Sequence, residues 1–322
     1  MTTVADGLFQ YGGMPVGSLY NGKWFFVDPA NGADGNSGRS PDRALATLYR
    51  AHALMTAGKN DVCVLIGDGA TTGTARLSLA LAVSADPTAA VTPTAGTLVW
   101  SKNACHLIGV TAPTMVAQRA RIAPPSGTYT VTTFGSATLI SVTASGCHSV
   151  TGGRNYFKNV NIGGLADAES AQAAGARTLF ISGTGENTFE DCVIGLDTVT
   201  RTAANATVEF AAATPRNVFK NCVFPFMTSA ATPLGFIATG NGSMDRYQLF
   251  DGCSFINNIG STSTTMTVLA SCSTASPGGL FVHKDSNLVG IGEYGDANGL
   301  TNTRVMGASG TAASTGIAIT PS

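Results

Sequence analysis

One eight-residue pattern recurs four times in this chain at almost constant spacing. The copies read NYFKNVNI, NTFEDCVI, NVFKNCVF and, in a looser form, YQLFDGCSF. The residues that align them are Phe157, Phe189, Phe219 and Phe250. Their intervals of 32, 30 and 31 residues are typical of repeat architectures, in which each unit packs only on its neighbours. The chain is therefore expected to fold as a stack of coils.

The aligned columns indicate two strands joined by a tight bend in each coil. Two positions after the phenylalanine stand residue types that tolerate a left-handed backbone: Asn159, Asp191, Asn221 and Gly252. Three positions after it stand the small apolar residues Val160, Cys192, Cys222 and Cys253. Five positions after it stand Ile162, Ile194, Phe224 and Phe255. Alternate residues of the second strand are therefore predicted to point inward.

The column directly after the phenylalanine alternates in charge. It holds Lys158, Glu190, Lys220 and Asp251. If successive coils stack as parallel strands about 4.8 Å apart, this column forms a ladder of opposite charges on the outer surface. Each exposed pair would contribute only about 0–1 kcal/mol, so the ladder matters as an indicator of strand register.

A coil of about 30 residues with a one-residue bend between two strands predicts a parallel β-helix with three strands in each coil. A helix is predicted over residues 42–57, with Ser40 as its N-cap and Gly58 as its stop signal, and it would cap the N-terminal end of the stack. The expected division is an N-terminal arm over 1–27, a turn-rich segment with the capping helix over 28–60, the coil over 61–295 and a C-terminal arm over 296–322.

Composition excludes several classes of function. Only 11% of the residues are charged and the net charge is −1, so no general attraction to nucleic acid or to anionic membranes is expected. No run approaches the roughly 18 apolar residues that a membrane span needs, and the first residues do not resemble a targeting signal. The seven cysteines form no CxxC pair, which indicates reduced thiols in a soluble protein made in the cytosol.

The first part of the chain resembles a known protein family. The run WFFVDPANGADGNSGRSPDRALATLYRAHAL, followed by a short alternating strand, resembles the first segment of right-handed parallel β-helix proteins of the pectate-lyase-like superfamily. The stretch ADGLFQYGGMPVGSLYNGKWFFVDPANG is similar to β-helix proteins encoded beside phage capsid genes. The resemblance implies a structural role in a virion, as a trimeric decoration or cement protein of the head or as a tail component.

Because this superfamily includes enzymes, clustered acidic residues are the first candidates for catalytic residues. Glycoside hydrolysis needs two carboxylates about 5–10 Å apart in a sugar-binding groove. The candidates are Glu186, Glu190, Asp191 and Asp197. Asp191 stands in the bend column, and Glu190 stands between Lys158 and Lys220, so a structural role explains both. The arginine motif of pectate lyases is not present, because Arg216 in the PRN stretch is a lone arginine at a strand entrance.

Two further sets of residues are considered for metal binding or nucleophilic chemistry. Oxygen ligands of the kind that calcium prefers stand at Asp28, Asn31, Asp34 and Asn36, but their spacing is not that of an EF-hand, and turn formation is favoured. His106 and His148 each follow a cysteine, Cys105 and Cys147, in what we interpret as equivalent positions on two coils. Small core residues are the favoured interpretation of these cysteines over a metal site or a nucleophile. The other histidines, His52 and His283, have no evident partner.

The predicted fold class is therefore all-β: a right-handed, single-stranded parallel β-helix with an N-terminal helical cap and extended terminal arms. The predicted function is that of a non-enzymatic phage virion protein, a homotrimer bound to the major capsid protein on the outer surface of the capsid after synthesis in the host cytoplasm. No catalytic, cofactor-binding or metal-binding residue is predicted, and no cofactor, nucleic acid or membrane partner. The alternative is a tailspike-like β-helix that binds or cleaves polysaccharide.

Overall fold

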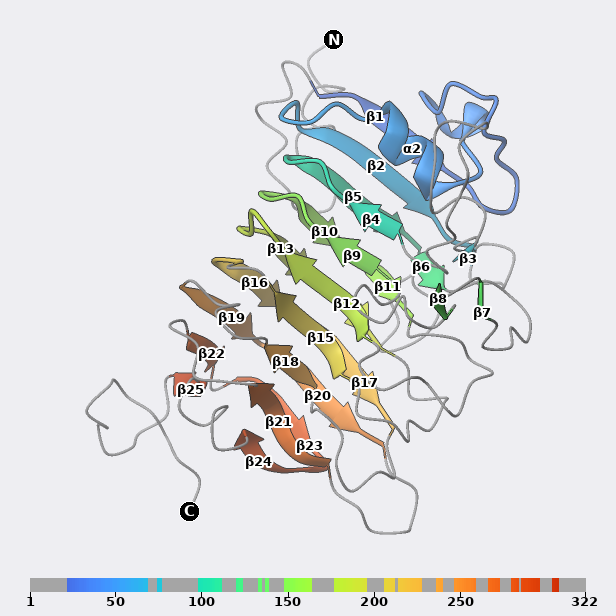
Figure 1. Ribbon diagram of the computed structural model, residues 1–322. Helices are drawn as coiled ribbons and strands as arrows, with labels where there is room; N and C mark the ends of the chain where they lie inside the picture. The colour runs from blue at the N-terminus through green and yellow to red at the C-terminus, as the bar shows by residue number, and fades with distance from the viewer. Residues whose placement is uncertain are drawn as a thin grey trace.

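The strands of the protein stack into a tapering column with a small helical cap at its N-terminal end (Figure 1). The computed structural model describes residues 22–68, 74–76, 98–111, 120–123, 133–134, 137–138, 148–163, 177–195, 206–211, 214–227, 236–239, 246–258, 266–272, 279–283, 285–295 and 303–306. In this part of the chain, three long sheets are parallel throughout and one short hairpin is antiparallel.

Sheet A has nine strands and begins at the capped end of the stack. In spatial order they are β1 (Trp24–Val27), β2 (Asp61–Ile66), β5 (Cys105–Val110), β10 (Tyr156–Lys158), β13 (Thr188–Glu190), β16 (Asn217–Lys220), β19 (Tyr247–Asp251), β22 (Gly279–His283) and β25 (Thr303–Met306).

Sheets B and C have seven strands each. Sheet B contains β3 (Thr74–Arg76), β6 (Ala120–Ala123), β11 (Val160–Ile162), β14 (Val193–Ile194), β17 (Val223–Phe226), β20 (Ser254–Asn257) and β23 (Asn287–Val289). Sheet C contains β4 (Leu98–Trp100), β9 (His148–Val150), β12 (Arg177–Ser182), β15 (Ala206–Ala211), β18 (Ile237–Thr239), β21 (Met266–Cys272) and β24 (Ile291–Gly295). The hairpin joins β7 (Thr133–Phe134) to β8 (Ala137–Thr138).

The chain contributes strands to the three sheets in a repeating order. From β2 onward, with the hairpin as the one interruption, each strand of sheet A is followed by one of sheet B and then one of sheet C. Every step along a sheet therefore advances the chain by one coil. This connectivity is that of a parallel β-helix with three strands in each coil, and it confirms the predicted fold class.

Stacked phenylalanine rings fill the interior beside sheet A. The rings of Phe157, Phe189, Phe219 and Phe250 lie 4.6, 4.8 and 4.7 Å apart from one coil to the next, with planes within 8° of parallel. All four side chains are fully buried. The ring spacing equals the spacing of hydrogen-bonded strands, so the predicted column and its register are confirmed.

The bends between sheets A and B have the predicted backbone. Asn159, Asp191, Asn221 and Gly252 have φ of 52°, 53°, 50° and 62°, all in the left-handed region. A second column of left-handed residues forms the turn that enters sheet A, and it includes Arg154, Glu186 and Arg216 with φ of 59°, 57° and 51°. Side chains at both ends of the sheet A strands are therefore held at fixed turns.

A buried ladder of amide side chains links four coils at the entrance to sheet A. Its members, each two residues before a stacked phenylalanine, are Asn155, Asn187, Asn217 and Gln248. The side-chain oxygen of each of the last three accepts a hydrogen bond from the backbone N–H of the member one coil earlier, at 3.0–3.1 Å. Cys105 N–H donates in the same way to Asn155 Oδ1 at 2.9 Å. The ladder satisfies buried backbone donors that the turns leave without a strand partner.

The capping helix is shorter than predicted. It spans α2 (Leu48–Leu54) with Thr47 as N-cap, and Pro41–Arg43 form a separate 3₁₀ turn, η2. The prediction of a helix over 42–57 with Ser40 as N-cap is therefore wrong. Asp34 Oδ1 accepts hydrogen bonds from the backbone N–H groups of Ala46 and Thr47, both at 2.9 Å, and Leu45 pairs with β1. Ala44 is extended, Leu45 forms a bridge with β1, and the helix therefore begins only at Leu48.

The coil reaches past the predicted limits of 61–295 at both ends. Strand β1 pairs with β2 in sheet A, and β25 pairs with β22 in the same sheet. Of the terminal arms predicted over 1–27 and 296–322, residues 1–21, 296–302 and 307–322 lie outside the described residues.

Five cysteines of the described residues are buried and free: Cys63, Cys105, Cys192, Cys222 and Cys253. Each sulfur of the stacked column at 192, 222 and 253 lies 3.4–3.5 Å from the backbone oxygen of the phenylalanine one coil earlier. None of the helices in this part of the chain is long and apolar enough to cross a membrane.

Replacement of Asn221 tests the left-handed bend. Asn221→Val is expected to lower the free energy of unfolding by about 1–2 kcal/mol, because a branched side chain is strained at positive φ. Asn221→Gly, the matched control, is expected to change it by less than about 0.5 kcal/mol. Urea unfolding followed by circular dichroism measures both free energies of unfolding. Equal losses in the two variants would show that the bend does not require a left-handed residue at this position.

Replacement of Asn187 tests the amide ladder. Asn187→Ala leaves the buried N–H of Asn155 without its acceptor and is expected to lower the free energy of unfolding by about 1–3 kcal/mol. Asn287→Ala removes an exposed asparagine from β23 and is expected to change it by less than about 0.5 kcal/mol. The same unfolding experiment compares them, and a ladder variant as stable as the control would refute the role of the ladder.

Candidate functional site

Two clusters of charged side chains lie at opposite ends of strand β13, on the outside of sheet A. We call the six residues of these clusters the sheet A polar face: Arg154, Tyr156, Lys158, Glu186, Glu190 and Arg216. They come from β10 and β13 and from the turns that enter β10, β13 and β16. Because neighbouring sheet A strands are in register, residues 32 and 30 positions apart in the sequence lie side by side.

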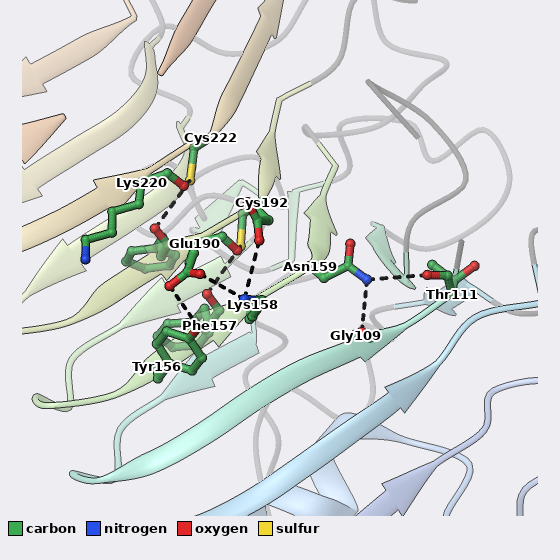
Figure 2. A network of polar contacts seen from close by, with 12 residues as sticks. Gly109, Thr111, Tyr156, Phe157, Lys158, Asn159, Glu190, Cys192, Lys220 and Cys222 are labelled. Carbon is green, nitrogen blue, oxygen red and sulfur yellow. Dashed lines mark hydrogen bonds and ion pairs between the residues drawn. The ribbon is translucent and has the colours of Figure 1, made fainter. Parts of the chain in front are cut away.

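The first cluster surrounds the carboxylate of Glu190 (Figure 2). Lys158 Nζ lies 2.8 Å from Glu190 Oε1 and 3.5 Å from Asp191 Oδ2. The Tyr156 hydroxyl donates a hydrogen bond of 2.9 Å to Glu190 Oε2. Both oxygens of Glu190 therefore have a donor from the preceding coil, and the carboxylate is held in one position.

The charges of this cluster shift the pKa values of its members in opposite directions. Burial acts to raise the pKa of Glu190, but the hydrogen bonds from Lys158 and Tyr156 outweigh it and hold the pKa below its ordinary value. Burial acts to lower the pKa of Lys158, and the hydrogen bond to Glu190 outweighs that effect and raises it. Burial, and then the hydrogen bond to Glu190, raise the pKa of Tyr156. At neutral pH the cluster is an ion pair with a neutral phenol.

The second cluster places one carboxylate between two guanidinium groups. Glu186 Oε2 lies 3.0 Å from Arg154 Nε, and Glu186 Oε1 lies 2.8 Å from Arg216 Nη1. The hydrogen bonds from Arg154 and then Arg216 hold the pKa of Glu186 below its ordinary value. The side chains of Arg154, Arg216 and Glu186 are 73%, 40% and 34% exposed, so a ligand in solution can reach all three.

The structure brings together three of the four acidic residues that were considered as catalytic candidates. Glu186 and Glu190 share one face with Asp191, and all three interact with basic side chains. Asp197 lies outside the described residues. Lys220 is paired in register with Glu190, as the charge ladder predicts. Because both glutamates are ionised at neutral pH, they suit hydrogen-bond acceptance, general base or nucleophile roles better than proton donation.

The candidate Cys–His pairs do not form equivalent sites. Cys105 and His106 lie in β5 of sheet A, whereas His148 lies in β9 of sheet C, so the predicted equivalence is wrong. His106 Nδ1 accepts the backbone N–H of Tyr156 at 3.1 Å, and burial lowers the pKa of this ring to about 4. Burial raises the pKa of Cys105 to about 12, which makes its thiol a poor nucleophile. Cys147 and the side chain of His148 lie outside the described residues.

The candidate calcium ligands are engaged in turns. Asp28 Oδ1 accepts the backbone N–H groups of Ala30 and Asn31 at 3.0 and 3.1 Å. Asp34 fixes the start of α2, and the side-chain amide of Asn36 donates to Ala44 O at 2.9 Å. Among the described residues no group of three or more His, Cys, Asp or Glu side chains is placed to hold a metal ion.

Sequence reasoning missed two members of the polar face, Arg154 and Tyr156, and set aside a third, Arg216, as a lone arginine at a strand entrance. Arg154, Tyr156 and Arg216 stand three, one and three residues before a stacked phenylalanine. The sequence does contain a signal for the two arginines. The column three residues before the phenylalanine holds Arg154, Glu186 and Arg216, and it alternates in charge like the column directly after the phenylalanine. His283, the remaining candidate, lies in β22 with its side chain outside the described residues.

Comparisons with known proteins support the fold. No protein-family model matches the sequence, and no curated protein matches it. Among solved structures, a pectin methylesterase variant in complex with a hexasaccharide is 15% identical, with a TM-score of 0.50 over 91% of this chain and 73% of that one. The pectin methylesterase PemA from Erwinia chrysanthemi is 14% identical, with a TM-score of 0.47 over 87% and 68%. Pectate lyase Pel9A is 12% identical, with a TM-score of 0.44 over 84% and 64%.

This chain therefore shares the parallel β-helix fold of the solved pectin methylesterase. At these identities the likeness concerns the fold alone. The prediction that the chain is not an enzyme is contradicted by the same comparison, because the solved structure with a TM-score of 0.50 is by name a pectin methylesterase. The lack of a familiar motif in the sequence was not sufficient ground for excluding catalysis.

The pH dependence of stability tests the Glu190 cluster. The folded pKa of Glu190 lies below the ordinary value of 4.5, so its stabilisation is present above pH 4.5 and is lost as the pH falls through the folded pKa. Glu190→Gln is expected to cost about 1 kcal/mol at neutral pH and progressively less below pH 4.5. Thermal unfolding across this range measures the difference. Asp42→Asn, an exposed carboxylate of η2, is the control, and a cost of Glu190→Gln that does not depend on pH would contradict the ion pair.

Proposed function

We propose that this chain is a polysaccharide-binding β-helix of a phage virion, of the tailspike kind, and that the sugar lies across the sheet A polar face. The observation that carries the proposal is the fixed array of donors and acceptors at the two ends of β13. Its accessible members, Arg154, Glu186 and Arg216, can hydrogen-bond sugar hydroxyls or charged substituents, and their positions are set by hydrogen bonds within the protein.

The fold supports a ligand of this class. The solved pectin methylesterase that shares the fold is in complex with a hexasaccharide. A stack of coils offers an extended surface along which one strand follows another about every 4.8 Å, which suits a long and repetitive ligand. Pre-positioned polar groups bind with a smaller loss of side-chain freedom, because they are ordered before the ligand arrives.

Binding of defined polysaccharides tests the proposal. The purified chain is exposed to immobilised bacterial capsular polysaccharides, lipopolysaccharide O-antigens and homogalacturonan, and release of reducing ends is followed on any polymer that binds. The double substitution Glu186→Gln and Arg216→Ala is expected to weaken binding about 10-fold or more. Asp42→Asn with Arg43→Ala, at the capped end of the stack, is the matched control and keeps full affinity. Binding that survives the first pair of changes, or no binding to any polymer, refutes the proposed site.

The place of the protein in a virion is a separate part of the proposal. The predicted homotrimer on the outer capsid surface, bound to the major capsid protein, remains a prediction. Mass spectrometry of purified particles separated into heads and tails measures it directly. Recovery with tails supports the tailspike-like function, recovery with heads supports decoration, and absence from both rejects a virion role.

A further inference from the structure

One lysine of the coil binds the C-terminal end of the capping helix. Lys102 follows β4, and its Nζ donates hydrogen bonds to the backbone oxygens of His52, Ala53 and Met55, the last two at 3.0 and 2.6 Å. These are the carbonyls that a helix leaves without internal partners. Leu48 and Ala51 on the buried face of α2, together with Met55 directly after the helix, close the end of the hydrophobic core.

His52 lies in the last turn of the same helix, against the end of the aromatic column. Its ring centroid is 4.9 Å from that of Trp100, which in turn packs edge-on against Phe157 at 5.9 Å. His52 Nε2 is shielded from water and has no hydrogen-bond partner among the described residues. A neutral imidazole can leave this nitrogen unprotonated, whereas an imidazolium carries a proton on both nitrogens and would bury an unpaired N–H.

We propose that this cap is an acid-sensitive switch: protonation of His52 releases α2 from the N-terminal end of the coil, while the coil itself stays folded. The inference is independent of the proposed polysaccharide binding. A cation in the last turn of a helix is ordinarily favoured by the terminal carbonyls. Here those carbonyls are already bound to Lys102, so a charged His52 adds a second cation for which the described residues offer no partner at Nε2.

The other charged and titratable groups around the cap do not offset this charge. Asp61 in β2 is fully buried, and its two oxygens accept the backbone N–H groups of Lys23 and Thr56, both at 2.7 Å. Cys63 in β2 and Cys105 in β5 are buried thiols. Strand β1 reads WFFV and β4 reads LVW, so neither carries a titratable side chain. Among the described residues, Lys102 is therefore the charge that acts on His52.

The electrostatics of the site agree with this geometry. Burial, and then the positive charge of Lys102, lower the pKa of His52 from its ordinary value of 6.5 to about 4. A lowered histidine pKa means that the folded cap binds fewer protons than the released cap between these two values. The cap is therefore most stable above pH 6.5 and weakens as the pH falls from 6.5 towards 4.

Hydrogen exchange followed by mass spectrometry on the full chain tests the switch. After correction for intrinsic rates, exchange of residues 47–58 is expected to rise about 10-fold or more between about pH 7 and about pH 5, whereas that of residues 217–226 does not change. His52→Phe keeps a ring against Trp100 without a titrating group and is expected to abolish the rise. Arg50→Gln removes a charge from an exposed position of the same helix and is expected to retain it.

Three results would overturn the proposal. The first is no rise in exchange of residues 47–58 in the wild-type chain, and the second is an equal rise in His52→Phe. The third is simultaneous opening of residues 217–226, which would mean that acid unfolds the whole coil. If His52→Phe does not fold, His52→Gln takes its place, and an unchanged acid response in that variant likewise rejects His52 as the sensor.

Discussion

Stacking of identical side chains at the spacing of hydrogen-bonded strands is the interaction on which this fold depends. The phenylalanine rings of four successive coils lie 4.6–4.8 Å apart and nearly parallel, and Phe224 and Phe255 repeat the arrangement beside sheet B at 4.6 Å. A shift of one residue in any strand would turn its phenylalanine to the outside. The rings thus fix the register of each coil on the previous one. The outward side chains of neighbouring strands are therefore aligned in the same register.

The amide ladder applies the same spacing to polar groups. An asparagine side chain reaches the backbone N–H of the neighbouring coil because the two lie one strand apart, and the contact repeats from Gln248 through Asn217 and Asn187 to Asn155. The residue before each asparagine in the ladder is one of Arg154, Glu186 and Arg216, in the left-handed conformation. The buried ladder therefore holds the turns that carry the exposed charges, and the accessibility of the polar face does not depend on flexible loops.

Sequence columns predicted most of the features that repeat, apart from the amide ladder, and missed features that occur once. The stacked phenylalanines, the left-handed bends and the register of the charge ladder all followed from alignment of four short segments, because each column has a single physical cause. The start of α2 did not, since it is set by Asp34, thirteen residues before Thr47 and outside any repeat. The amide ladder was readable as a column but was overlooked because asparagine is usual in turns. The contacts of Tyr156 could not be read from its column, whose other members are threonine, valine and leucine.

Because the coils are stacked in one dimension, a structural change in one coil directly affects only its neighbours. Each coil contacts only the coils above and below it, so stability is close to a sum of coil terms and nearest-neighbour terms. Loss of α2 from the N-terminal end removes the contacts of Leu48, Ala51 and Met55 but none of those between Phe189, Phe219 and Phe250. Trp100 is the point where the cap and the aromatic column meet, because it contacts both His52 and Phe157. A cap that responds to acid at this end is therefore compatible with a polar face that keeps its geometry further along the stack.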